Sequence, residues 1–221
     1  MEIKVNEKAK KVLAKITTCK GEVIGFSAID KPSVKFNPEG VYTVSILIPK
    51  KEGEALLKVF QDIKKQQYKT FGKGSTAQDI TRLKPFVVVE KNEDGEVVKE
   101  IPDAEGRYVL KASEKATVKC KNGTVFNKKI GIFDAKGKPC REVMLGEGSI
   151  VRLAIEAAGY TVAGKTGLSV NLKAVQVIEY KEYGSEATFT TYGFEEEEGF
   201  EMEEETEKET TITEEDEEAG F

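Results

Sequence analysis

The stretch Gly148–Tyr180 reads GSIVRLAIEAAGYTVAGKTGLSVNLKAVQVIEY, and it decides the fold. Its first part, GSIVRLAIEA, and its last part, GLSVNLKAVQVIEY, are rich in β-branched residues that alternate with polar ones, which predicts two long strands. The segment AGKTG between them predicts a hairpin loop. In the second strand the alternation changes phase after Ala174, which predicts a β-bulge near that residue.

The same stretch contains Gly159–Thr166, GYTVAGKT, which matches the P-loop pattern of nucleotide hydrolases. A P-loop must be followed by a helix, because the helix N-terminus holds the phosphates. Here Gly167 and the alternation after it predict a strand instead. We therefore interpret the match as a hairpin loop that places Lys165 on the rim of a strand.

The remaining body is predicted to be strands with a single helix. The segment EGEALLKVFQDIKKQQYKTFG has apolar residues at helical spacing, which predicts a helix over residues 52–71 with Gly72 as its C-cap. Two strands are expected before this helix, of which Val41–Ile48 alternates most clearly. After it, RYVLK and ATVKCK alternate, and Asn122-Gly123 predicts a hairpin turn into TVFNKKIGIF. Short strands with one capping helix make a mainly β, OB-fold-like small barrel the leading candidate.

Two domains follow from these patterns. Residues 1–184 form the predicted barrel, in which residues 73–106 are an elaborated loop with an exposed hairpin around Asp94-Gly95. Residues 185–221 carry a high density of like charge and few branched apolar residues, which predicts a disordered acidic tail.

Charge divides the chain more sharply than its formal net value of -5 suggests. Residues 185–221 hold 16 acidic residues and one base, a net charge of -15, and the body holds 23 acidic and 33 basic residues, a net charge of +10. A basic body with an acidic tail indicates a polyanion as the partner of the body. A flexible tail of this length spans roughly 30–37 Å, so it could cover a basic groove on its own body and yield to a longer polyanion.

Several classes of function are not expected. The chain has no histidine, which removes His-dependent catalysis, and its three cysteines, Cys19, Cys120 and Cys140, are scattered. We therefore expect a non-catalytic protein with no cofactor and no metal site. No apolar stretch approaches the roughly 20 residues of a membrane span, and the N-terminus lacks a signal-peptide pattern, so a cytoplasmic location is expected.

Bases interleaved with aromatics indicate how the body would hold its polyanion. In single-stranded nucleic acid, lysine and arginine follow the phosphates, while exposed aromatic faces stack on the bases. Phe36, between Lys35 and Asn37-Pro38, is predicted to lie at a loop tip and is the best single stacking candidate. The candidate single-stranded DNA-binding residues are Lys35, Phe36, Tyr42, Arg107, Tyr108, Lys111, Lys115, Lys119, Lys121, Phe126, Lys128, Lys129, Tyr160 and Lys165.

The layout resembles the single-stranded DNA-binding proteins of T7-like bacteriophages and their relatives. The resemblance rests on Gly148–Tyr180, on the helix between early and late strands, and on the acidic tail that ends in Phe221. It implies an OB-fold that coats single-stranded DNA during phage replication, recombination and repair in the host cell. It also implies a tail that competes for the DNA groove and binds DNA polymerase and the helicase-primase, with a homodimer possible. The tail residues matched by position are Glu214, Glu215, Asp216, Glu217, Glu218 and Phe221.

Two alternatives stay open at this point. An OB-fold protein that binds RNA would carry the same interleaved bases and aromatics. A protein-interaction module could instead use the acidic tail to bind a basic partner, with no role for nucleic acid. Binding to DNA, RNA and duplex oligonucleotides separates these cases.

Overall fold

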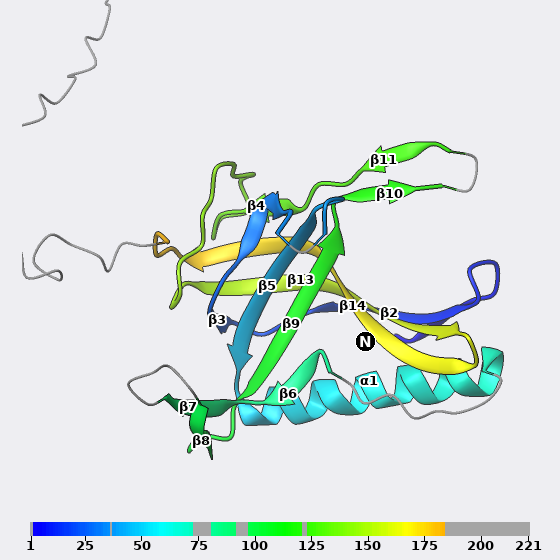
Figure 1. Cartoon of the computed structure of the whole chain (residues 1–221), viewed down its shortest axis with the longest axis horizontal. Coiled ribbons are helices and arrows are strands. Elements are labelled where there is room, and N and C mark those ends of the chain that lie inside the picture. Colours follow the sequence, from blue (N-terminus) through cyan, green and yellow to red (C-terminus); the bar gives the residue numbers. More distant parts are fainter. Residues whose placement is uncertain (1, 36, 73–80, 92–96, 121–122, 184–221) are drawn as a thin grey trace, which may run out of the picture. The chain divides into compact units, whose positions relative to one another are not determined.

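The protein is mainly β with a single helix among the residues that the structure describes (Figure 1). The structure is a computed structural model, and all of the described residues belong to the unit Met1–Ser185. The predicted tail, residues 185–221, lies outside them, so its separation as a domain stays a prediction. The described residues are 2–35, 37–72, 81–91, 97–120 and 123–183.

Five strands pair in a ring, which confirms the OB-fold-like prediction. In ring order they are β13, β3, β5, β9 and β14, and β14 pairs again with β13. All neighbours in the ring are antiparallel except β9 and β14, which meet in parallel at the single register pair Ser113 and Asn171. The pairing of β9 with β14 is therefore short, and the ring is not a regular barrel. The bounds are β3 Gly21–Val23, β5 Val41–Ile48, β9 Tyr108–Lys115, β13 Ile150–Val162 and β14 Lys165–Glu179.

Shorter strands extend the ring or pair apart from it. Five of them join the same sheet: β1 (Lys4–Asn6), β2 (Lys11–Thr17), β4 (Ala28–Ser33), β6 (Leu83–Pro85) and β12 (Gly131–Phe133). Two further pairs stand separately: β7 (Val87–Lys91) with β8 (Val97–Pro102), and β10 (Thr117–Lys119) with β11 (Val125–Asn127).

The number of strands before the helix differs from the prediction. Five described strands precede it, β1 to β5, where the sequence predicted two. Two of them, β1 and β3, are three residues long, and β4 contains Pro32, so alternation could not reveal them. Both hairpins predicted at Asp94-Gly95 and Asn122-Gly123 are confirmed by the β7–β8 and β10–β11 pairings, although Asp94, Gly95 and Asn122 lie outside the described residues.

The β13–β14 hairpin confirms the reading of Gly148–Tyr180 as two long strands. Its turn contains Ala163 with φ of 48° and Gly164 with φ of 74°, and no helix follows, so the P-loop match is a hairpin loop as predicted. Ala154 faces Ala174, whereas its neighbour Ile155 faces Leu172. One extra residue therefore lies between the two partners on β14, which confirms the predicted bulge.

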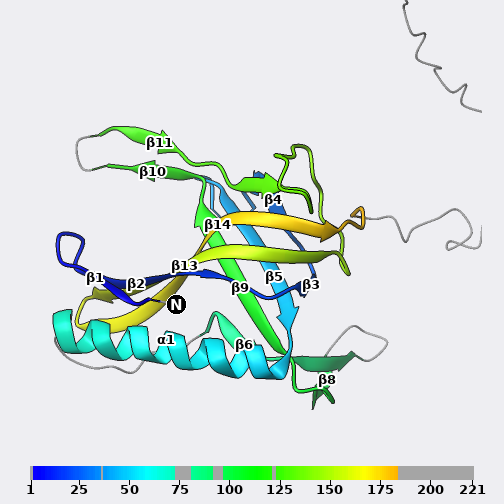
Figure 2. The same cartoon turned by 180° about the vertical axis from the view of Figure 1, so that it is seen from behind.

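Helix α1, Lys50–Phe71, has Gly72 as its C-cap and packs on β2, β13 and β14 (Figure 2). Leu56, Phe60 and Ile63 are buried at the predicted spacing, and they join the core formed by the inward side chains of the ring. In the described part of the chain, no helix is both long and apolar enough to cross a membrane.

A buried glutamine fastens the far end of α1 to the sheet. Gln67 is fully buried, and its Oε1 accepts a hydrogen bond of 2.7 Å from the backbone N–H of Val12. Its Nε2 donates to the carbonyl of Lys10 at 3.1 Å and to Oγ1 of Thr161 at 3.3 Å. A Cβ at Gly159 would lie 2.6 Å from the Gln67 side chain, so glycine is required there for this contact. The helix is thus tied to β2 and to the β13–β14 hairpin through one side chain.

Candidate nucleic-acid interface

A groove lies on the outer face of β5 and β9. Alternation places Tyr42, Val44 and Ile46 of β5 in the core and turns the residues between them outward. Across the strand pair, Thr43 lies opposite Ser113 and Ser45 opposite Lys111. The groove has a volume of about 830 Å³, and its floor comprises Val41, Thr43, Ser45, Val109, Lys111 and Ser113.

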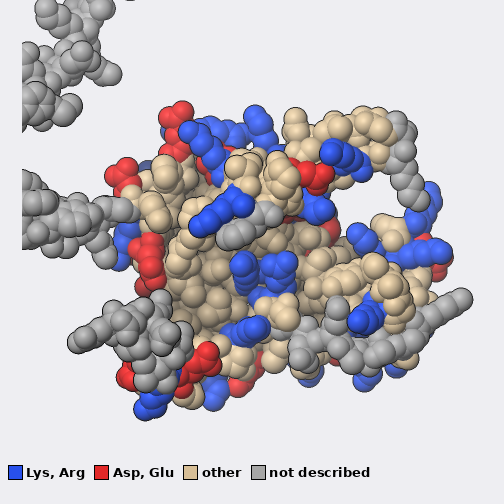
Figure 3. Space-filling model, in the orientation of Figure 1, with Lys and Arg blue, Asp and Glu red and all other residues tan. Residues whose placement is uncertain are grey.

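The described residues that line this groove include three bases and no acid. The bases are Lys35, Arg82 and Lys111, and the backbone N–H of Lys111 donates to the carbonyl of Arg82 at 2.8 Å, which brings those two residues together. Among the described residues, neither Arg82 nor Lys111 forms an ion pair. Figure 3 shows basic side chains gathered at the middle of the face that β5 and β9 cross. The local charge therefore favours a polyanion.

Two exposed aromatic rings line the same groove. Phe26 is 60% exposed and Tyr183 is 55% exposed. Phe26 follows Gly25, whose φ of 60° is a conformation that favours glycine and turns the chain after β3. The predicted stacking residues did not include Phe26 or Tyr183, and the predicted bases did not include Arg82. The motif Gly25-Phe26-Ser27, a turn glycine before a lone aromatic, was the available signal for Phe26.

The predicted binding residues divide between this groove, the core and other surfaces. Lys35 and Lys111 line the groove. Phe36 lies outside the described residues, although its neighbours Lys35 and Asn37 line the groove as well. The prediction that Tyr42 binds DNA is wrong. Tyr42 is 5% exposed, and its hydroxyl donates to the carbonyl of Lys128 at 3.1 Å, so its ring belongs to the core and cannot stack on a base.

A second group of predicted residues lies on or beside the β10–β11 hairpin, which we call the arm. Lys115 precedes the arm, Lys119 lies on β10, and Phe126, 55% exposed, lies on β11. Lys128 and Lys129 follow β11 and are exposed. Lys121 lies outside the described residues. None of the described members of this group lines the groove.

Lys128 is held by a buried acid at the base of the arm. Glu114 is 8% exposed and accepts hydrogen bonds from Nζ of Lys128 and, at 2.7 Å, from Nζ of Lys173. Burial of the Glu114 carboxyl raises its pKa, but the hydrogen bonds from the two lysines outweigh burial and hold the pKa below its usual value. Lys128 therefore neutralises Glu114 and is not a free phosphate ligand.

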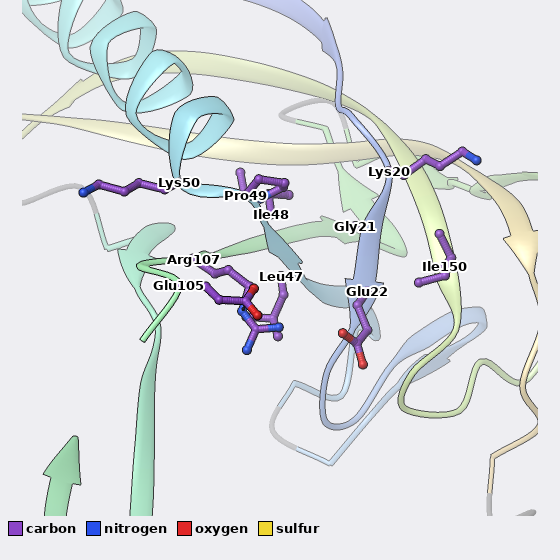
Figure 4. A pocket seen from close by; sticks show the side chains of 10 residues that line it. All are labelled: Lys20, Gly21, Glu22, Leu47, Ile48, Pro49, Lys50, Glu105, Arg107 and Ile150. Atoms are coloured by element: carbon purple, nitrogen blue, oxygen red, sulfur yellow. Dashed lines mark ion pairs between the residues drawn. The ribbon is translucent and has the colours of Figure 1, made fainter. Parts of the chain in front are cut away.

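Arg107 lines a different, smaller cavity of about 230 Å³ (Figure 4), and Tyr108 follows Arg107 as the first residue of β9. The guanidinium of Arg107 contacts Asp103 at 2.9 Å and Glu105 at 3.4 Å, and Figure 4 shows Glu105 lying against it. The hydrogen bonds from Arg107 lower the pKa of the Asp103 carboxyl. The Tyr108 ring packs against the first turn of α1, where a Cβ at Gly53 would lie within 2.4 Å of it. Both residues are thus engaged structurally, away from the groove.

Tyr160 and Lys165 lie on the β13–β14 hairpin. Tyr160 is half-buried on β13, and Lys165 is exposed at the start of β14, the rim position that the sequence predicted. Neither lines the groove on β5 and β9. The predicted tail residues, Glu214 to Glu218 and Phe221, lie outside the described part of the chain.

The described part of the protein contains no candidate metal site, and its three cysteines are not paired. No cluster of three His, Cys, Asp or Glu side chains there could hold a metal ion. Cys19, Cys120 and Cys140 are free thiols. Burial of the Cys19 thiol, with the Glu52 carboxylate adding to it, raises its pKa, which makes that thiol less reactive.

Comparison with solved structures finds the same fold in a phage protein. The single-stranded DNA-binding protein gp2.5 of bacteriophage T7 has a TM-score of 0.55 at 17% identity, over 86% of this chain and 100% of that chain. The single-stranded DNA-binding protein of bacteriophage Enc34, in complex with single-stranded DNA, has a TM-score of 0.48 at 15% identity, over 80% of this chain and 90% of that chain. The likeness to the T7 protein shows the fold alone.

The family of the chain follows from a comparison of sequences. No curated protein matches. The family model described as "Enterobacter phage Enc34, ssDNA-binding protein" matches residues 19–209, which include the ring, the helix, the arm and most of the acidic tail. Because this span is far more than half of the chain, the protein belongs to the family of the single-stranded DNA-binding protein of Enterobacter phage Enc34.

Proposed function

We propose that this protein binds single-stranded DNA without catalysing a reaction, and that the groove on β5 and β9 is its main contact surface. The observation that carries the proposal is the lining of the groove, which combines Lys35, Arg82 and Lys111 with the exposed rings of Phe26 and Tyr183 and contains no described acid. Family membership supports the choice of single-stranded DNA as the ligand.

The groove matches the chemistry of an unpaired strand. The three bases bind backbone phosphates, whose counterions are released, so binding weakens as salt rises. Phe26 and Tyr183 offer faces on which bases stack, each for about 1–3 kcal/mol, with little preference for sequence. In a duplex these base faces are already stacked, so the two rings would contribute nothing. The groove therefore discriminates between single strands and duplexes.

The wider role that we propose is the coating of single-stranded DNA during phage DNA replication, recombination and repair, in the cytoplasm of the host cell. In this role the acidic tail competes with DNA for the groove and binds DNA polymerase and the helicase-primase. The body charge of +10 and the tail charge of -15 support the competition. A homodimer is part of the same proposal.

Binding of labelled oligo-dT, oligo-rU and duplex DNA across a salt series tests the proposal. We expect preference for oligo-dT over duplex and a steep, linear fall of log affinity with log salt. Preference for oligo-rU would instead assign the RNA-binding alternative. Absence of binding to every nucleic acid would leave the protein-interaction alternative.

Removal of residues 185–221 tests the competition by the tail. A tail that binds its own groove with a dissociation constant of about 0.1 mM, at an effective concentration of about 1 mM, weakens DNA binding about tenfold. We therefore expect the truncated protein to bind oligo-dT about tenfold more tightly at low salt, measured by fluorescence anisotropy. Unchanged affinity would end the idea of self-competition.

The variant Phe221→Ala separates the aromatic tip from the acidic run in that experiment. If the tip binds a protein partner, this variant keeps the DNA affinity of the full chain and loses affinity for the polymerase. A gain in DNA affinity equal to that of the truncated protein would assign Phe221 to the competition for the groove.

A further inference from the structure

The arm is a basic hairpin that extends away from the ring. Its strands pair only with each other among the described strands, with Thr117 opposite Asn127 and Lys119 opposite Val125. Figures 1 and 2 show it directed away from the ring in both views. Val125 is 51% exposed, and its described neighbours Lys119 and Thr124 are exposed too. Such a hairpin buries little apolar surface of its own, so its stability has to come from its base.

The base of the arm is fixed by three contacts at one residue. The backbone N–H of Lys128 donates to the carbonyl of Ala116 at 2.7 Å, and the carbonyl of Lys128 accepts the hydroxyl of Tyr42 at 3.1 Å. The Nζ of Lys128 donates to the buried carboxylate of Glu114. Because Tyr42 and Glu114 belong to β5 and β9, the arm is held by the two strands that form the floor of the groove.

A row of lysines leads from the groove onto the arm. Lys111 lines the groove, and Lys115, four residues further along β9, lies directly opposite Val41, which also lines the groove. The side chain of Lys119, four residues beyond, reaches back to Glu39 at 3.4 Å, in the loop between Asn37 and β5. Lys111 and Lys115 are about 13 Å apart along β9, and Ala116 separates β9 from β10, which carries Lys119. Glu114 and Ala116 on either side of Lys115 are buried, so Lys115 is on the outer face.

We infer that the arm continues the DNA track beyond the groove, with Lys115 and Lys119 as phosphate contacts and Glu39 as an internal competitor for Lys119. The inference rests on the proposed binding of single-stranded DNA. Lys115 forms no ion pair among the described residues, so it is available to a phosphate. The Lys119 and Glu39 side chains are 66% and 33% exposed, and an ion pair so exposed to solvent is weak enough for phosphate to displace.

The length of the oligonucleotide distinguishes contacts on the arm from contacts in the groove. A short oligo-dT of about four nucleotides occupies the groove alone, whereas one of about 16 nucleotides reaches the arm, the range known for OB-folds. The double variant Lys115→Gln/Lys119→Gln should bind the long oligonucleotide about threefold to tenfold more weakly and bind the short one like the wild type. Its salt slope on the long oligonucleotide should fall by about 1.4, since each phosphate contact in a single strand contributes about 0.7.

The matched control is Lys136→Gln/Lys138→Gln, which removes the same charge from the exposed turn after β12. We expect it to bind both oligonucleotides like the wild type. The inference about the arm would be overturned if the Lys115→Gln/Lys119→Gln variant lost the same affinity for the short and the long oligonucleotide, or lost none for either. In both cases the proposed function would stand. Failure of the wild type to bind oligo-dT of any length would overturn both.

Removal of the charge of Glu39, the competitor for Lys119, should change the affinity for the long oligonucleotide in the opposite direction. Glu39→Gln frees Lys119 and should tighten binding of the long oligonucleotide by about twofold to fivefold, without changing the short one. Glu147→Gln, at an exposed position outside the groove and the arm, is the control for the loss of one negative charge. Equal gains for the two variants would show a general charge effect and would remove Glu39 from the inference.

Discussion

Replacement of Lys111 by glutamate is expected to cost about 2 kcal/mol of binding free energy for oligo-dT, which is about a 30-fold loss of affinity at low salt. Lys111 lies on the groove floor beside Arg82, so on the proposed binding surface the variant would place a repulsive carboxylate where a charge-assisted hydrogen bond to phosphate is expected. Fluorescence anisotropy with labelled oligo-dT measures the loss. Because the side chain is exposed, the fold should be unaffected, and thermal unfolding checks this.

The control for this prediction carries the same change of charge elsewhere. Lys136→Glu alters the net charge by the same amount on the turn after β12, outside the groove. Its effect should be threefold or less and should vanish at about 0.2 M salt, where charges further apart than about 8 Å are screened. If both variants lose affinity equally, net charge alone drives binding, and the groove is not the contact surface.

Replacement of Gln67 by leucine is expected to lower the free energy of unfolding by about 3 kcal/mol. Leucine has a similar size, but it leaves the buried N–H of Val12 and the carbonyl of Lys10 without their partner. A buried backbone group without a hydrogen bond costs about 1–3 kcal/mol. For a domain of this size the midpoint of thermal unfolding should fall by about 6–12 °C, which circular dichroism or calorimetry measures.

Gln61 on the same helix provides the comparison, since it is exposed and Gln61→Leu changes the same atoms in solvent. We expect that variant to stay within about 0.5 kcal/mol of the wild type. A Gln67→Leu protein as stable as Gln61→Leu would mean that burial of the leucine offsets the lost hydrogen bonds, and that the link from α1 to β2 is dispensable.

The parts of the fold that the sequence predicted are those with a long, regular pattern. The helix over residues 52–71, the two strands of Gly148–Tyr180 and the bulge near Ala174 have enough residues for periodicity to be read. The three-residue strands β1 and β3 have too few, and their pairing with distant strands is a tertiary effect. Gln67 shows a second limit: it occupies an apolar position of α1 because of its partners in β2 and β13, which no local pattern contains.

The sequence predicted the kind of ligand that the candidate site would bind better than it predicted the residues of that site. Interleaved bases and aromatics indicated single-stranded nucleic acid, and Lys35 and Lys111 lie in the groove. Tyr42 shares its face of the alternating strand with Val44 and Ile46, so the pattern already favoured the core, and its choice as a stacking residue was wrong. Arg107 reads as a free base until Asp103 and Glu105 are placed beside it. Phe26 was missed because a single aromatic in a turn has no periodicity.

The pairing of β2 with β13 has a consequence for synthesis of the protein. One edge of β2 pairs with β1, which is made just before it, but Thr17 on the other edge lies opposite Ala154, so that edge gains its partner only after about 137 further residues have been made. At about 5–20 residues per second, translation of that length takes roughly 7–27 s, during which the edge of β2 that faces β13 has no native partner. Its apolar face, Val12, Ala14 and Ile16, would invite pairing with other nascent chains. Lys11 and Lys15 alternate with that face, and their charges protect the waiting strand from aggregation until the ring can close.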